Sequence, residues 1–167
     1  ERVAYLRLAA QKRRAAGEEN GEADAPAVVE ETEEGGEAVT LSPEREAELA
    51  NAEQFILAVT EKGFGKRTSA YEYRLVGRGG QGIRAIGFDD KAEKGETAKW
   101  RTGREVVATF TVEAAEDILL VTDGGKVIRT PAEQVRITGR TAMGVRLARP
   151  EAEERVTSCF PVMEDEE

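Results

Sequence analysis

An internal repeat constrains this chain more than any other feature of its sequence. Thirteen residues between positions 56 and 86 recur 62 positions later without a gap. The matched residues are Ile56, Leu57, Val59, Thr60, Gly63, Arg67, Thr68, Ala70, Arg74, Gly77, Arg78, Gly82 and Arg84. A fixed period of this length is typical of arrays of similar structural units. The chain therefore contains two copies of one supersecondary unit.

Each copy has the residue pattern of short β-strands separated by glycine turns. The run at 55–60 is closed by a turn at 61–63, and its counterpart at 117–122 by a turn at 123–125. Further strands are expected at 82–88 and 144–149. A strand of the second unit is expected at 105–113, and a closing strand at 155–163 in the matching place after that unit. Tyr71 and Tyr73 are expected to alternate on an edge strand. The predicted fold is all-β, with propeller-like blades in a partial array, because two blades cannot close a ring.

The first 53 residues have a different pattern. Apolar spacing predicts a helix over residues 1–16, and Ser42 followed by Pro43 predicts a second helix start. Between them, residues 18–37 hold nine acids and no base, which is typical of a disordered segment. We therefore expect a helical acidic insert at 1–53, blade units at 54–104 and 105–163, and an acidic tail at 164–167. Residues 89–104 would form a mobile loop.

The net charge of −9 is unevenly distributed. Residues 51–150 carry 17 basic and 13 acidic groups, whereas both flanking regions are acidic. Because the repeated residues include arginines, a stepped basic rim that contacts DNA phosphates is the preferred hypothesis. The proposed contacts are Lys66, Arg67, Arg74, Arg78, Arg84, Arg129, Arg136, Arg140 and Arg146. The alternative is that these arginines lie on solvated strand faces or pair with acids.

Catalytic and metal chemistry are not expected of this chain. It has no histidine and one cysteine, Cys159, so an activated thiol and a tetrahedral zinc site are both implausible. The loop Gly77, Arg78, Gly79, Gly80, Gln81, Gly82 lacks the Gly-Lys-Ser/Thr ending of a nucleotide phosphate loop. No apolar run has the length of a membrane helix, so no membrane partner is expected.

Residues 54–163 resemble the last blades of the C-terminal domain of the DNA gyrase A subunit. The resemblance rests on the strings FILAVTEKGFGKRTSAYEYR, GRGGQGIRAI and DILLVTDGGKVIRTPAEQVRITGRTAMGVRL. It implies a β-pinwheel that wraps duplex DNA around a basic rim, which supports ATP-dependent negative supercoiling. The loop at 77–82 resembles a degenerate copy of the family's Gln-Arg-Arg-Gly-Gly-Lys-Gly box, with Gln81 in place of lysine.

The resemblance also implies the wider context of the chain. The expected partners are the remaining blades and N-terminal part of the gyrase A subunit, together with the gyrase B subunit. ATP and magnesium would be used elsewhere in the enzyme, with no cofactor here and a cytoplasmic, nucleoid-associated location. Two alternatives stay open: the C-terminal domain of the topoisomerase IV A subunit, and a propeller-like protein-interaction module whose acidic insert recruits a partner.

Overall fold

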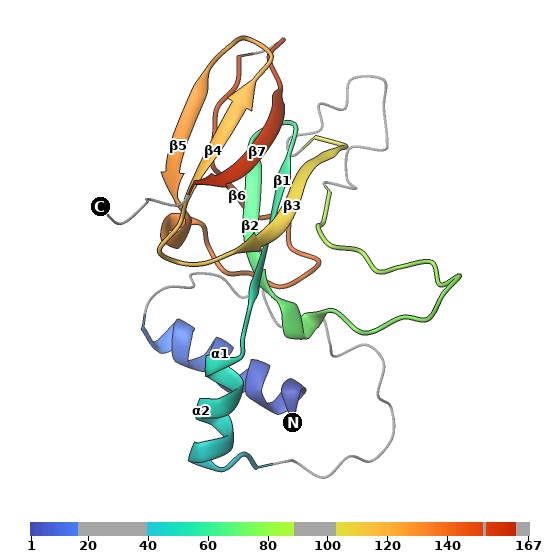
Figure 1. Cartoon of the computed structure of the whole chain (residues 1–167), viewed down its shortest axis with the longest axis vertical. Coiled ribbons are helices and arrows are strands. Elements are labelled where there is room, and N and C mark those ends of the chain that lie inside the picture. Colours follow the sequence, from blue (N-terminus) through green and yellow to red (C-terminus); the bar gives the residue numbers. More distant parts are fainter. Residues whose placement is uncertain (17–39, 89–102, 152, 163–167) are drawn as a thin grey trace.

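The computed structural model describes residues 1–16, 40–88, 103–151 and 153–162. Two antiparallel sheets form most of this part of the chain, and a pair of helices lies at the opposite end from the three-stranded sheet (Figure 1). Three expectations fall outside the described residues. They are the disordered segment at 18–37, most of the mobile loop at 89–104, and the acidic tail at 164–167. The arrangement confirms the predicted all-β blades.

The first repeat forms three strands of one sheet. Strands β1 (Phe55–Thr60) and β2 (Phe64–Ser69) make a hairpin, and β3 (Val106–Val112) pairs antiparallel with the other edge of β1. The strand expected at 105–113 in the second unit therefore joins the sheet of the first, since its backbone pairs with β1. Gly63 closes the hairpin with a φ of +77°, a conformation that glycine adopts without steric cost. The 3-10 helix η2 (Ala70–Glu72) follows β2.

The second repeat reproduces this arrangement in detail. Strands β4 (Asp117–Thr122), β5 (Val127–Pro131) and β7 (Val156–Val162) form a sheet in the order β5-β4-β7, and the 3-10 helix η4 (Ala132–Gln134) follows β5. A register shift falls at the last residue of β4, as it does at the last residue of β1. The sequence repeat therefore extends to the irregularities of the backbone.

A short strand from the second repeat joins the sheet of the first. Strand β6 (Val145–Arg146) pairs with β2, which gives the four-stranded order β3-β1-β2-β6. Just before it, Ile137 forms a parallel bridge with Arg67. The two repeats are thus linked by backbone pairing as well as by side-chain packing.

An apolar core lies between the two sheets. Leu57, Val59, Ile118 and Leu120 are fully buried, and they come from the two equivalent strands β1 and β4. The other core residues are Val112, Ala132, Val135, Ala148, Val156 and Cys159. Alternating inward positions on both central strands supply this core, as expected for packed sheets.

Helices α1 (Arg2–Ala15) and α2 (Pro43–Asn51) pack together, and α1 also contacts η2 of the first repeat. Ser42 caps α2 by accepting a hydrogen bond from the Arg45 amide, as its sequence predicts. The Tyr5 hydroxyl donates to Glu53 at 2.7 Å, and its ring meets that of Tyr71 edge-on, with the centroids 5.7 Å apart. These contacts fix α1 against η2.

Two expectations about local structure are wrong. Residues 82–88 form no strand, and the equivalent region at 144–149 forms only the two residues of β6, since only there does a β2 edge lie alongside. Tyr71 lies in η2 rather than on an edge strand, and its hydroxyl donates to the Leu49 carbonyl at 2.9 Å. Tyr73 follows η2 directly, outside any strand.

Candidate nucleic-acid interface

Lys66 and Arg67, two of the predicted phosphate contacts, lie inside the molecule. Lys66 is fully buried, and its ammonium donates to the Gly139 carbonyl at 2.6 Å and also to the Arg140 carbonyl. The buried Arg67 donates from Nε to the Val135 carbonyl at 2.7 Å and from Nη2 to the Glu133 carbonyl at 3.0 Å. Both cations bind the second repeat to β2, so the structure gives them a structural role instead of a surface position.

The backbones of the two repeats also approach each other closely, at Gly144 of the second repeat and Gly65 of β2. Gly144 has a φ of +80°, and a Cβ at this position would lie 2.4 Å from the Gly65 carbonyl oxygen. Its counterpart in the first repeat, Gly82, has a φ of +74° but open space around it. The same backbone conformation therefore occurs in both repeats, but only the second repeat is packed against a neighbouring strand.

The predicted box loop at 77–82 lies at the surface. All six residues are exposed, and a turn is closed by the Gly80 amide, which donates to the Gly77 carbonyl at 3.2 Å. Gly79 has a φ of +79° and no neighbouring atom in the way. Such a loop gives a phosphate backbone close access to the peptide amides and to Arg78.

The other predicted arginines differ in exposure. Arg74 and Arg84 are exposed, whereas Arg136 and Arg140 are partly buried. Arg140 donates from Nη1 to the Arg84 carbonyl at 2.6 Å, and its amide donates to a Glu72 carboxylate oxygen at 2.6 Å. Arg140 thereby connects the second repeat to residues on either side of the loop at 77–82.

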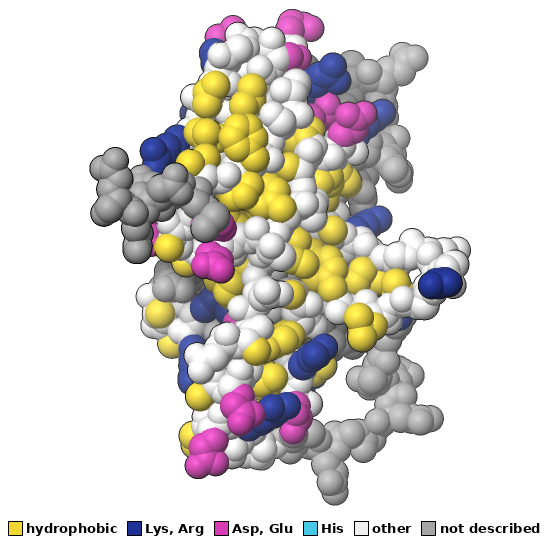
Figure 2. Space-filling view, viewed as in Figure 1, with side chains coloured by type: hydrophobic (Ala, Val, Ile, Leu, Met, Phe, Trp, Pro, Cys, Tyr) yellow, Lys and Arg dark blue, Asp and Glu magenta, His cyan; other side chains and the backbone are white. Residues whose placement is uncertain are grey.

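Two exposed arginines occupy strands. Arg129 on β5 forms an ion pair with Asp117, and Arg146 on β6 lies with its guanidinium carbon 4.9 Å from the centre of the Phe64 ring. On the face shown in Figure 2, hydrophobic side chains gather in the middle, whereas Lys and Arg lie mostly toward the edges and at the end that holds the helices.

Arg13 is a residue that the sequence predictions missed. It lies in the last turn of α1, among three basic residues, and lines a pocket with Arg67 and Arg136. The sequence does show a cluster of basic residues around Arg13. The repeat pattern could not assign Arg13 to a site, because α1 lies outside the repeat.

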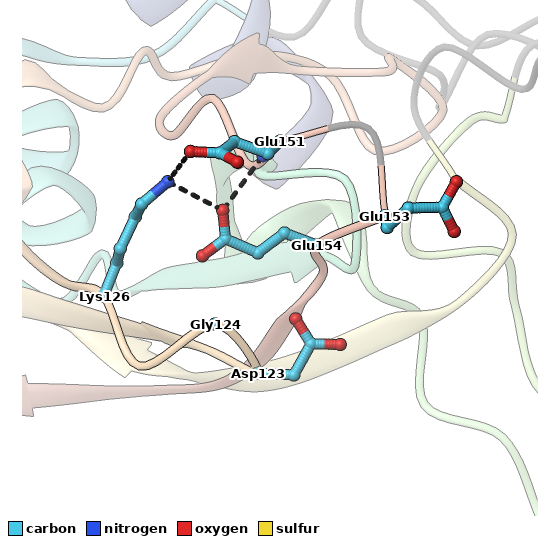
Figure 3. A pocket seen from close by; sticks show the side chains of 6 residues that line it. All are labelled: Asp123, Gly124, Lys126, Glu151, Glu153 and Glu154. Carbon is cyan, nitrogen blue, oxygen red and sulfur yellow. Dashed lines mark hydrogen bonds and ion pairs between the residues drawn. The ribbon is translucent and has the colours of Figure 1, made fainter.

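A second pocket, at the β4–β5 turn, is dominated by acids. Lys126 forms ion pairs with Glu151 at 2.8 Å and Glu154 at 3.0 Å, while Glu153 points away from both (Figure 3). The Glu151 amide, the Thr122 hydroxyl and Lys126 all donate to Glu154 and lower its pKa to about 2. This network holds the turn together and repels an anionic ligand.

The remaining chemistry of the described residues is limited. Burial raises the pKa of the Cys159 thiol to about 12, so the thiol stays protonated at neutral pH. Within the described ranges, no group of three or more Cys, Asp or Glu residues is arranged to hold a metal ion. No helix in these ranges combines the length and apolarity needed to cross a bilayer.

A family comparison decides how these features are interpreted. The model of the DNA gyrase C-terminal domain, a beta-propeller family, matches residues 54–95 and 116–163, which is more than half of the chain. The chain belongs to this family. The matched ranges contain both repeats and all nine predicted phosphate contacts.

Curated relatives agree with the family model. The DNA gyrase A subunit of Granulibacter bethesdensis is 50% identical over 99% of this chain, and that of Rickettsia bellii is 44% identical over 75% of it. The chain spans 17% and 13% of the lengths of these two relatives. It therefore corresponds to a small part of each.

Two solved structures have the same fold. The structure of a DNA gyrase A C-terminal domain matches with a TM-score of 0.57 and 26% identity, over 67% of this chain and 34% of that one. The C-terminal domain of DNA topoisomerase IV matches with a TM-score of 0.53 and 17% identity, over 65% of this chain and 31% of that one. At that identity the second match shows a shared fold alone, so the gyrase family is the better supported of the two.

Proposed function

We propose that the chain is a non-catalytic DNA-binding and wrapping module of the DNA gyrase A subunit. Its exposed arginines would contact the backbone of duplex DNA without reading the base sequence, and the bent duplex would support ATP-dependent negative supercoiling. The exposed glycine loop with Arg78 is the observation that carries the proposal, because it offers donors to phosphates with few side chains in the way.

The proposed contacts are fewer than the sequence suggests. Lys66 and Arg67 are withdrawn, since their donors bind carbonyls inside the molecule. The exposed candidates are Arg74, Arg78, Arg84, Arg129 and Arg146. Arg136 and Arg140 stay as partly buried candidates, with Arg140 also linking the second repeat to the Arg84 carbonyl of the first.

The context of the module is part of the same proposal. It would act with the other blades and the N-terminal part of the gyrase A subunit, and with the gyrase B subunit, in the bacterial cytoplasm at the nucleoid. ATP and magnesium would be bound by those other parts, and this module would need no cofactor.

The test uses the assembled gyrase with Arg78→Glu and Arg146→Glu in the module. We expect weaker binding to a random-sequence duplex, a flatter dependence of log K on log salt by roughly 0.9 for each lost contact, and reduced supercoiling. Arg7→Glu is the control, since it makes the same kind of substitution at an exposed site of α1, outside the repeats, and each single variant can be compared with it at equal charge. Unchanged DNA affinity and supercoiling in a folded double variant would refute the proposal and favour a protein-interaction module.

A further inference from the structure

A pocket of about 470 Å³ lies between the helical insert and the second repeat. Its wall is formed by Arg13 of α1, Arg67 of β2, Val145 of β6 and the segment 133–137. Three arginines line it, Arg136 being the third, against one carboxylate from Glu133. A hollow with this excess of positive charge attracts anions.

Arg67 and Arg136 contribute to the pocket in different ways. Arg67 is held in place by the carbonyls of Glu133 and Val135, so its charge has a fixed position at the wall. The Nε–H of Arg136 is shielded from water and has no hydrogen-bond partner in the described part of the chain. Buried donors without partners are uncommon in native proteins, and an oxyanion beside this guanidinium would offset the cost.

Arg13 is brought to the pocket by a helix whose position is fixed. Tyr5 anchors α1 through its hydrogen bond to Glu53 and its ring contact with Tyr71. Arg2, at the other end of α1, lies 5.3 Å from the centre of the same Tyr71 ring. These contacts hold the backbone of α1 beside the pocket, so binding would need to order only the Arg13 side chain and not the helix.

The lining also indicates the chemical class of the ligand. Guanidinium groups pair well with the oxygens of a phosphate. Among the described residues that line the pocket none is aromatic, so a nucleobase would find no stacking surface. A single phosphate group fits this chemistry better than a whole nucleotide does.

We propose that this pocket receives one backbone phosphate of the bound duplex, so that the helical insert adds a DNA contact that the blades alone lack. The inference rests on the proposed function, because the phosphate is part of the DNA that the module would bind. It assigns a role to α1, a region outside the match to the family model.

The experiment measures the salt dependence of duplex binding by the full-length gyrase protein that carries this chain. Arg13→Gln should lower the slope of log K against log salt by roughly 0.9 and weaken binding at low salt, since one phosphate contact is lost. Arg13→Lys should keep the slope, because the charge remains. Arg7→Gln is the matched control, being an exposed arginine of the same helix that does not line the pocket. Circular dichroism would verify that each variant retains its fold.

The outcomes separate this inference from the proposed function. If the wild type binds with a steep slope and Arg13→Gln leaves that slope unchanged, the pocket assignment is wrong and the DNA-binding module stands. An equal loss in Arg7→Gln would also overturn the assignment, since any positive charge on α1 would then serve. A folded wild type without salt-dependent binding would overturn both.

Discussion

Replacing Lys66 with methionine tests whether this residue joins the repeats or contacts DNA. The ammonium is fully buried and donates to the carbonyls of Gly139 and Arg140. A hydrogen bond to a charged group is worth about 1.5–3 kcal/mol, and a buried acceptor left without its donor costs about 1–3 kcal/mol. Methionine removes two such bonds but also relieves the desolvation of the ammonium. We therefore expect a net loss of about 3 kcal/mol in the free energy of unfolding.

Urea unfolding followed by circular dichroism would measure this loss. With a slope of about 2 kcal/mol per molar urea, the midpoint should fall by about 1.5 M. Lys62→Met is the matched control, because it makes the same substitution at a partly exposed site in the turn before β2. It should change the free energy of unfolding by less than about 0.5 kcal/mol. The reasoning is refuted if Lys66→Met keeps the wild-type midpoint and instead flattens the salt dependence of DNA binding.

Two further predictions concern the close contact between the repeats and the acidic network. Gly144→Ala should destabilise the fold by clearly more than Gly82→Ala, measured by urea unfolding. Both place a side chain at positive φ, at about 1–2 kcal/mol, but only the first drives a Cβ against the Gly65 carbonyl. Glu154, whose pKa is lowered to about 2 in the fold, stabilises the folded state above the ordinary glutamate pKa of 4.5. This contribution should disappear as the pH falls from about 4.5 to 2, and Glu154→Gln should flatten the change of the urea midpoint over that range.

Each of these predictions has a definite contradicting result. Equal effects of Gly144→Ala and Gly82→Ala would mean that the approach to β2 does not constrain position 144. For the acidic network the control is Glu153→Gln, an exposed neighbour that points away from Lys126 (Figure 3). If Glu154→Gln retains the wild-type acid profile, the hydrogen bonds to Glu154 do not contribute to stability at neutral pH.

The sequence predicts the strands well because the residues that define each strand and turn lie close together within each repeat. Short continuous apolar runs closed by glycine turns define β1, β4 and their hairpins. Each copy supports the assignment made for the other. The pairing of β6 with β2 could not be predicted, since periodicity reveals a strand but not the sheet that it joins. Lysine is rarely fully buried, so residue type alone favoured an exposed Lys66.

The arginines show why a repeated residue need not have a repeated role. Arg67 and Arg129 occupy equivalent positions in the two repeats. Arg67 is buried against carbonyls of the second repeat, whereas Arg129 is exposed and pairs with Asp117. A local pattern fixes the backbone at such a position, and the neighbouring unit decides whether its charge faces a carbonyl or solvent.

This distinction has a measurable consequence for the whole module. If all nine predicted cations contacted phosphates, the slope of log K against log salt would be about −8, whereas the seven candidates that remain without Lys66 and Arg67 would give about −6.3. The phosphate proposed for the pocket beside Arg13 would add about −0.9 to both values. The difference is too large to be produced by any single variant. A slope at the smaller of the two magnitudes or below would support the assignment of Lys66 and Arg67 to the link between repeats, because these two cations would remain bound to carbonyls whether or not DNA is present.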